Sequence, residues 1–353
     1  MTPSFWSGRR VLVTGHTGFK GAWLALWLSR SGAHVYGYSL APATTPNLYT
    51  QTRLSKLLQG EFIEDIRDAD KVERALRRAT PELIFHLASQ TEVRESYREP
   101  LETFSTNIQG TIVLLDKLRL YNVETPTIIV TSDKCYRNSE IGDSFVETDE
   151  LGGGDPYSAS KACQEIATEA MFKAFFCNNG RISTARAGNV LGGGDWAAER
   201  LVPDLIRATK GGKRLQLRYP EAVRPWQYVL DLLSGYLELS EWLSEKTSPT
   251  FSTFNFGPNL KSSTSVRALV DKFEVALARE VPITICKPIE KEAGTLTLNS
   301  NKACQQLNWK TRCNLSETIS ETVRWYKCVA DGHNPRDASL EAISRFESIE
   351  RHD

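Results

Sequence analysis

Three glycines spaced three residues apart, Gly15, Gly18 and Gly21, separate a short apolar run from a Leu- and Ala-rich segment near the start of the chain. The run at 10–14 is typical of a strand buried on both faces, and the segment at 22–28 predicts a helix. A strand that turns directly into a helix points unpaired backbone N–H groups and the positive end of the helix dipole at one place. Such a turn suits a pyrophosphate, and glycines let the ligand approach the backbone.

The glycine turn therefore predicts a dinucleotide-binding site, with an ordinary glycine-rich turn as the alternative. The spacing G-x-x-G-x-x-G differs by one residue from the commonest dinucleotide-binding motif, so the pattern alone is weak evidence. Its position at the start of a chain of alternating strands and helices makes the evidence strong. The turn residues expected to contact the cofactor are Gly15, His16, Thr17, Gly18, Phe19 and Gly21.

Strand-like and helix-like segments alternate through the first half of the chain. Because parallel strands must be joined by crossover connections, this alternation predicts an α/β fold with a doubly wound parallel sheet. Further strands are expected at 34–38, 61–63, 83–86, 127–131 and 181–186, and helices at 69–78, 103–119 and 156–176.

The alternation ends near Gly188, beyond which glycines and prolines separate shorter elements. At 353 residues the chain also exceeds a single compact domain. We therefore expect a Rossmann domain, a smaller C-terminal substrate-binding lobe and a polar, loosely packed tail. The expected ranges are 1–188 for the Rossmann domain with a returning segment near 221–258 and a strand at 254–256, 189–220 and 259–333 for the lobe with a helix near 316–329, and 334–353 for the tail.

Composition argues against several classes of protein. Forty-three basic residues balance forty-three acidic ones, so no strong positive field exists to collect the phosphates of a nucleic acid. No apolar run approaches the roughly 20 residues of a membrane-spanning helix, and the N-terminal segment does not read as a signal peptide. The seven cysteines are scattered without a C-x-x-C pair, so we expect neither disulfides nor a metal site, and a cytoplasmic location.

The end of the second strand bears on the choice between NAD and NADP. An acidic residue there would bind the adenosine ribose and an arginine would accommodate the extra phosphate of NADP, but the sequence reads Tyr-Ser-Leu-Ala at 38–41. Because no arginine is present, we expect NAD. After the third strand, Asp65 could face the adenine, with Ile66 beside it, or could be only a turn or capping residue.

Tyr157 and Lys161 stand four residues apart in the predicted helix at 156–176, one above the other on the same face. An ammonium beside a phenol favours the phenolate and lowers the pKa of the tyrosine, so Tyr157 is a candidate base for a sugar hydroxyl that loses hydride. Ser132 follows the strand at 127–131, at the edge where such sheets bind ligands, and could hold the same hydroxyl.

This order of glycine turn, Ser132, Tyr157 and Lys161 resembles that of the extended short-chain dehydrogenase/reductases. Within them the chain is most similar, over nearly its whole length, to the CDP-D-glucose 4,6-dehydratases. The matching stretches are residues 13–21, 131–136, 155–161, 186–196, 224–227, 255–258 and 307–309.

The pair Asp133 and Lys134 carries the finer resemblance, because dTDP-glucose dehydratases have Asp-Glu there and sugar epimerases lack an acid/base pair. The resemblance implies that NAD oxidises C4 of the sugar, that Lys134 as a neutral amine removes the C5 proton, and that Asp133 protonates the departing C6 hydroxyl. Desolvation near other cations, such as Lys161, could keep Lys134 neutral. The alternative is a solvated turn pair after a strand.

Four residues are expected to bind the sugar nucleotide. Arg200 and Arg224 could each grip diphosphate oxygens through two hydrogen bonds, and Gln227 belongs to the same Arg-Pro-Trp-Gln segment as Arg224. Asn189 resembles a family asparagine that contacts this ligand. The alternatives are surface arginines and a capping asparagine.

The resemblance implies an enzyme that converts CDP-D-glucose to CDP-4-dehydro-6-deoxy-D-glucose and water with tightly held NAD. The alternatives are a 4,6-dehydratase or epimerase for another nucleotide sugar, and a catalytically silent dinucleotide-binding sensor. The chain departs from the family at Thr91 and Glu92, where relatives usually carry proline and leucine, and this departure affects the local substrate contacts.

The resemblance also implies a homodimer that pairs through the helix at 156–176. An apolar face on this helix could form the contact, or could instead pack onto the sheet. The residues of that face are Ala162, Ile166, Ala167 and Ala170.

Overall fold

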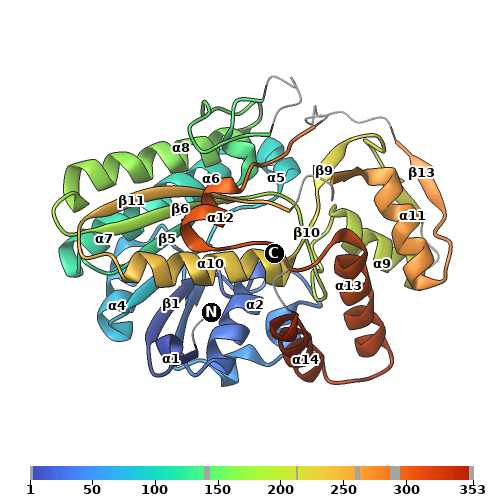
Figure 1. Ribbon diagram of the computed structural model, residues 1–353, viewed down its shortest axis with the longest axis horizontal. Coiled ribbons are helices and arrows are strands. Elements are labelled where there is room, and N and C mark those ends of the chain that lie inside the picture. Colours follow the sequence, from blue (N-terminus) through green and yellow to red (C-terminus); the bar gives the residue numbers. More distant parts are fainter. Residues whose placement is uncertain (1–2, 139–143, 212–213, 259–262, 287–294, 350–353) are drawn as a thin grey trace.

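Seven parallel strands form the central sheet of the molecule (Figure 1). The computed structural model describes residues 3–138, 144–211, 214–258, 263–286 and 295–349. The first strand lies inside the sheet, the next two extend the sheet to one side, and the later ones extend it to the other, so the doubly wound α/β prediction is confirmed. In sheet order the strands are β11 (Thr250–Phe256), β6 (Arg181–Ala187), β5 (Thr127–Val130), β4 (Leu83–His86), β1 (Arg10–Thr14), β2 (His34–Ser39) and β3 (Gly60–Ile63).

Continuous apolar runs account for β1, β4 and β5, because both faces of the sheet are covered. In β1, Val11 and Val13 pack into one hydrophobic cluster while Leu12 between them packs into another. β4 and β5 are buried along their whole length. β11 begins four residues earlier than predicted, at Thr250, because its first residues are only half-buried and show no apolar run.

Helices form a layer on each face of the sheet (Figure 1). α2 and α10 contact each other on one face, and α4, α7 and α8 pack side by side on the other. The helices of these layers are α2 (Phe19–Arg30), α10 (Val229–Ser244), α4 (Ala69–Ala79), α6 (Pro100–Phe104), η2 (Ser105–Gln109), α7 (Gly110–Tyr121), α8 (Pro156–Met171) and η4 (Phe172–Phe176).

Local chemistry accounts for the start of α4 and the end of α2. The Asp68 side chain accepts hydrogen bonds from the backbone N–H groups of Asp70 and Lys71 at the start of α4. α2 ends at Arg30, and Gly32 then adopts a φ of 85°, which glycine reaches at little cost.

Beyond β6 the chain adds helices and three two-stranded sheets beside the main sheet. One hydrophobic cluster runs from Trp6 to Phe346, so these elements share a core with the Rossmann strands, and the division into two lobes stays a prediction. Within the described ranges, none of the helices combines the length and apolar character needed to cross a membrane. The elements are β7 (Val190–Leu191), α9 (Leu201–Gly211), β8 (Leu215–Leu217), β9 (Val223–Pro225), β10 (Gln227–Tyr228), β12 (Ser263–Ser265), α11 (Val266–Leu277), β13 (Ile283–Ile285), α12 (Asn301–Leu307) and α13 (Leu315–Ala330).

The expectation of a loose polar tail from residue 334 is wrong for most of its length. Residues Pro335–Ser348 form a helix, α14, which packs against α2 and α13. Its polar composition hides a buried face, because Ala338, Ala342 and Phe346 recur at helical spacing. The Phe346 ring lies against Trp27 of α2 at 5.6 Å between ring centroids.

Phe346→Ala is expected to lower the free energy of unfolding by about 3–5 kcal/mol, because the ring is 1% exposed and its removal leaves a cavity. Urea unfolding followed by circular dichroism measures this change. Glu341→Ala, at an exposed position of the same helix, is the control and should change stability by less than about 0.5 kcal/mol. A Phe346 variant as stable as this control would show that α14 is not docked.

Candidate active site

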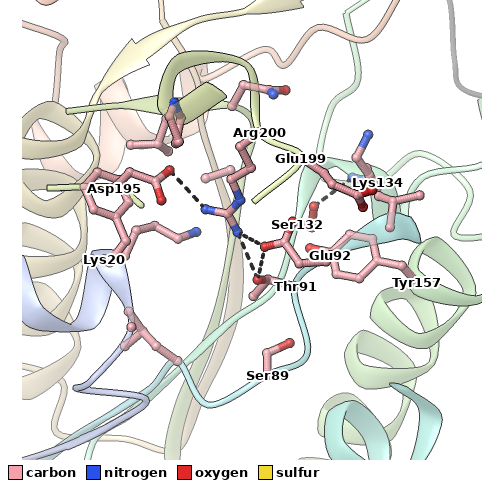
Figure 2. Close-up of a pocket in the computed structure, with 18 of the residues that line it drawn as sticks. Lys20, Ser89, Thr91, Glu92, Ser132, Lys134, Tyr157, Asp195, Glu199 and Arg200 are labelled. Carbon is pink, nitrogen blue, oxygen red and sulfur yellow. Dashed lines mark hydrogen bonds and ion pairs between the residues drawn. The ribbon is translucent and has the colours of Figure 1, made fainter. Parts of the chain in front are cut away.

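A cavity of about 600 Å³ opens along the carboxyl ends of the parallel strands. Residues far apart in the sequence meet there because parallel strands end at the same edge of the sheet. The cavity is lined by most of the residues singled out from the sequence (Figure 2). They are Gly15, Thr17, Gly18, Phe19, Gly21, Asp65, Ile66, Ser132, Asp133, Lys134, Tyr157, Lys161, Asn189, Arg200 and Arg224.

Two predicted contact residues do not line the cavity. The His16 side chain is fully buried, and its Nε2 lies 2.7 Å from Glu61 Oε1 on β3, so the imidazole supports the turn from behind. The Gln227 side chain is also buried and donates to the Phe256 carbonyl at 3.0 Å, so it ties β10 to the end of β11. Both side chains form hydrogen bonds with partners distant in sequence, Glu61 and Phe256, instead of facing the cavity.

The glycine turn has the geometry of an anion cradle. Gly15 has a φ of 74°, and a Cβ there would lie 2.7 Å from the Leu87 carbonyl carbon after β4. A Cβ at Gly21 would lie 2.1 Å from the Gly15 oxygen. Gly18 stands at the N-terminus of α2, where no side chain caps the helix. The free N–H groups of the first turn are therefore open to a bound pyrophosphate.

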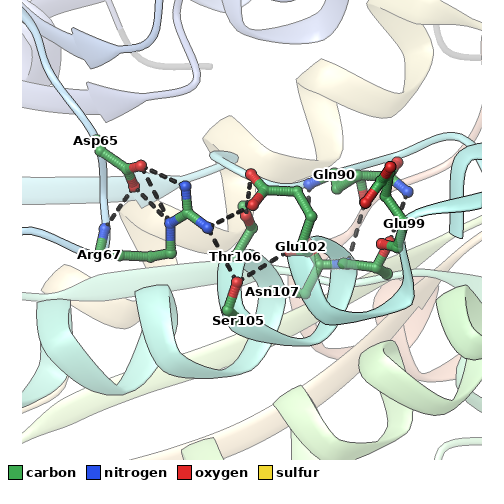
Figure 3. Close-up of polar contacts among 9 residues, drawn as sticks. Asp65, Arg67, Gln90, Glu99, Glu102, Ser105, Thr106 and Asn107 are labelled. Carbon is green, nitrogen blue, oxygen red and sulfur yellow. Dashed lines mark hydrogen bonds and ion pairs between the residues drawn. The ribbon is translucent and has the colours of Figure 1, made fainter.

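Asp65 is a turn residue whose carboxylate is already paired. The Arg67 guanidinium donates to both carboxylate oxygens and also to Glu102, at 2.6 Å, and Ser105 (Figure 3). The Arg67 hydrogen bonds lower the pKa of Asp65. The pairing with Arg67 supports Asp65 as a turn residue more directly than as a contact to adenine. The residue nevertheless lines the cavity.

Ser132 stands directly after β5 and organises the turn that follows. Its Oγ accepts the Lys134 backbone N–H at 3.2 Å and donates to Asp133 Oδ1 at 3.1 Å, which starts the short helix η3 (Asp133–Cys135). The turn therefore positions three consecutive side chains at the cavity wall. Lys134 remains half-buried, whereas Ser132 and Asp133 are buried.

The other Asp133 oxygen, Oδ2, is buried and has no hydrogen-bond partner among the described residues. Burial raises the pKa of Asp133, and the charge of Lys134 opposes that rise. A carboxyl in such a place retains its proton more readily than one in water. Gly188 makes room for it, because a Cβ there would lie 2.8 Å from Oδ2. The arrangement suits a proton donor.

Tyr157 and Lys161 both lie on α8 and line the cavity. The sequence predicts that the Lys161 ammonium lowers the pKa of Tyr157, but in the structure the pKa of Tyr157 is raised. Burial raises the pKa of Tyr157, and an interaction with the Ser132 hydroxyl opposes the rise. The Lys161 ammonium donates to Gln164 Oε1 at 3.0 Å and to the Val130 carbonyl at 3.5 Å. Burial also lowers the pKa of Lys161 to about 7. Both groups are therefore shifted toward their neutral forms.

A buried ion pair fixes α8 against the sheet. Glu165, one turn after Lys161, accepts from Arg186 of β6 at 3.0 Å, from Thr184 at 2.7 Å and from Thr131. Both charged side chains are almost fully buried. The pair joins the helix that carries Tyr157 to the ends of β5 and β6.

Sequence reasoning missed Lys20 and Asp195, two charged residues that line the cavity (Figure 2). Lys20 lies inside the glycine turn, where burial and the nearby Arg200 lower its pKa to about 8. Asp195 pairs with Arg200 at 3.3 Å. Lys20 could have been found from the sequence, because it lies between Gly18 and Gly21 of the predicted cofactor turn. No local sequence pattern singles out Asp195.

Comparisons with known proteins agree with this fold. A family model described as GDP-mannose 4,6 dehydratase matches residues 12–322. The chain is 39% identical over 352 residues to the CDP-glucose 4,6-dehydratase of Salmonella typhimurium, and the alignment covers 98% of each chain.

Solved structures of about one-fifth identity show the same fold. The dTDP-glucose 4,6-dehydratase of Bacillus anthracis in complex with NAD has a TM-score of 0.77 at 20% identity, covering 93% of this chain and 100% of that one. The UDP-glucose 4-epimerase of Stenotrophomonas maltophila with bound NAD and formylated UDP-arabinopyranose has a TM-score of 0.81 at 21% identity, covering 92% and 99%.

Glu165→Ala is expected to cost about 3–5 kcal/mol of stability, because it leaves the Arg186 guanidinium buried without its counter-charge. Glu169→Ala is the matched control. It removes a carboxylate one turn further along α8, where the pair with Lys173 is exposed and contributes at most about 1 kcal/mol. Thermal and urea unfolding compare the two variants, and equal midpoints would contradict a supporting role for Glu165.

Proposed function

The chain belongs to the GDP-mannose 4,6-dehydratase family, and we propose that it is an NAD-dependent enzyme that converts CDP-D-glucose to CDP-4-dehydro-6-deoxy-D-glucose and water. The observation that carries this proposal is the 39% identity to a CDP-glucose 4,6-dehydratase over 98% of both chains. Its chemical support is the set of acid, base and hydroxyl groups on one cavity wall, namely Ser132, Asp133, Lys134, Tyr157 and Lys161.

The glycine turn supports NAD as the cofactor. The uncapped N-terminus of α2 and the bare backbone at Gly15 and Gly18 fit a pyrophosphate. When bound, NAD supplies a nicotinamide that accepts hydride from C4 of the sugar and later returns it to C6. The end of β2 offers Ser39, hydrogen-bonded to Thr17 at 2.8 Å, and no arginine for a further phosphate.

Tyr157 and Ser132 are assigned to the sugar C4 hydroxyl. Ser132 holds the hydroxyl and Tyr157 takes its proton as the carbon is oxidised. Because burial raises the pKa of Tyr157, the phenol needs a positive charge beside it when it gives up its own proton. Lys161, on the same face of α8, supplies this charge in its protonated form, which is populated below its pKa of about 7, and the charge of Arg200 acts in the same direction.

Asp133 and Lys134 are assigned to the elimination of water. Lys134 takes the proton from C5, the electron pair of that C–H bond forms the C5–C6 double bond, and the C6–O bond breaks. Lys134 gives the proton back to C5 when C6 receives hydride, so the product regains its C5 hydrogen. Asp133 gives its proton to the departing hydroxyl, which leaves as water. The pKa of Asp133, raised by burial, favours the protonated form that this step consumes.

Lys134→Met is expected to separate the two halves of the reaction, because it removes the amine while Ser132 and Tyr157 remain. With CDP-glucose the variant should oxidise C4, accumulate reduced cofactor absorbance, and exchange the C5 hydrogen with deuterated solvent at least 100-fold more slowly than wild type. Mass spectrometry of the sugar nucleotide measures the exchange.

Tyr157→Phe is the contrasting variant and should block the reaction earlier, with turnover about 10²–10⁴-fold lower and no accumulated reduced cofactor. Wild-type C5 exchange in the Lys134 variant would remove Lys134 from the mechanism. A panel of CDP-, UDP-, dTDP- and GDP-sugars tests the substrate. Conversion of another nucleotide sugar in preference to CDP-glucose, or C4 epimer as the product, would replace the proposed activity.

We also propose a homodimer formed over α7 and α8, although the expected face needs one correction. Ala162 packs inward with Cys135 and Tyr136, so it is not available to a partner. The support comes from large apolar side chains that stay exposed on these neighbouring helices: Ile166 is 55% exposed, Phe175 of η4 49% and Ile112 37%.

Ile166→Glu is expected to dissociate this dimer, because it places a charge in an apolar contact. Multi-angle light scattering should give the mass of two chains for wild type and of one chain for the variant. Val275→Glu, at an 82% exposed position on α11, is the control and should remain a dimer. A wild-type mass of one chain at micromolar concentration would contradict the proposal.

Cysteine chemistry supports a cytoplasmic location. All seven cysteines lie in the described part of the chain, and each is a free thiol. Free thiols persist in a reducing compartment, so we propose that the protein works in the cytosol.

A further inference from the structure

Arg200 is held on three sides by side chains from two separate segments (Figure 2). Its Nη2 lies 2.6 Å from Glu92 Oε1 and 2.9 Å from Thr91 Oγ1, both after β4, and its Nη1 lies 3.3 Å from Asp195 Oδ2. Thr91 also donates to the same Glu92 oxygen at 3.0 Å. The carboxylates of Glu92 and Asp195 therefore neutralise the positive charge of the Arg200 guanidinium inside the cavity.

The Arg200 guanidinium and the Lys20 ammonium line the same cavity, where they could both contact an anionic ligand. Tyr157 lines this cavity as well. Burial and the charge of Arg200 lower the pKa of Lys20, and the charge of Arg200 opposes the rise that burial causes in the pKa of Tyr157. Lys20 makes no hydrogen bond or ion pair with the residues that the structure describes. Two neighbouring cations of this kind are typical of a site that receives phosphate oxygens.

Glu92 is the partner that can release Arg200. It makes the shorter contact, and its side chain is 35% exposed at the start of α5 (Val93–Arg98). Asp195 is 8% exposed in its side chain and is also tied to the Ala197 backbone N–H, so it cannot move away as freely.

We propose that Glu92 is a positioning residue that competes with the substrate diphosphate for Arg200 and so sets how tightly the cavity binds a nucleoside diphosphate sugar. This inference rests on the proposed function. A diphosphate that enters the cavity replaces the Glu92 carboxylate on Arg200, while Asp195 keeps the guanidinium in place. The competition weakens the grip on substrate and product alike, which favours product release.

Glu92→Gln keeps the size of the side chain and removes its charge. In the NAD-loaded enzyme, this variant should bind CDP and inorganic pyrophosphate on the order of tenfold more tightly than wild type, because a nearby negative charge has been removed. Isothermal titration measures both ligands. With nucleotide sugar, KM should fall by a similar factor while kcat does not rise.

Arg200→Gln tests whether the effect passes through Arg200. In that background the additional change Glu92→Gln should alter pyrophosphate affinity by less than about twofold. Glu199→Gln is the matched charge control, because this neighbouring carboxylate pairs with Arg94 and Arg98 of α5 instead. It should also change affinity by less than about twofold.

Unchanged or weaker binding of both ligands by Glu92→Gln overturns the proposal, and so does a tightening that persists without Arg200. Pyrophosphate separates this result from the proposed function, because it carries the diphosphate without a base or a sugar. A wild-type enzyme that ignores CDP-glucose but shows the Glu92 effect with pyrophosphate would refute the substrate and support the role of Glu92.

Discussion

One buried carboxylate, Glu165, holds α8 in register with the sheet. It accepts hydrogen bonds from Arg186 and Thr184 on β6 and from Thr131 directly after β5, while its own helix carries Tyr157 and Lys161. Removing two charges from water is costly, and only their mutual attraction and the added hydrogen bonds offset that cost. The distance between the groups after β5 and those on α8 therefore depends on this contact.

Burial then sets the protonation of the groups in the cavity. It raises the pKa of Asp133 and of Tyr157 and lowers the pKa of Lys161 and of Lys20. All four shifts favour the neutral form, because a charge loses its hydration in a protein interior. Asp133 can therefore hold a proton to donate, and Lys161 and Lys20, with pKa values of about 7 and about 8, can exist as neutral amines near neutral pH.

The cavity also contains a charge arrangement that the resemblance does not imply. The Arg200 guanidinium contacts Asp195 on the side where Lys20 lies and Glu92 on the opposite side (Figure 2). Arg200 and Asp195 come from the loop before α9, and Glu92 comes from the loop after β4. Their contact exists only because both loops meet at the carboxyl edge of the sheet. Affinity for a diphosphate is thus set by residues that do not take part in the proton transfers.

Local rules were enough to predict the strands of the central sheet, the glycine turn and the meeting of Ser132, Tyr157 and Lys161 at one edge. Each follows from short-range periodicity, or from the fact that parallel strands end together. The tertiary structure decided the rest. It turned His16 toward Glu61, directed Gln227 to the end of β11, docked α14 and reversed the expected pKa shift of Tyr157. These outcomes depend on burial and on partners far along the chain, and no local pattern of residues contains that information.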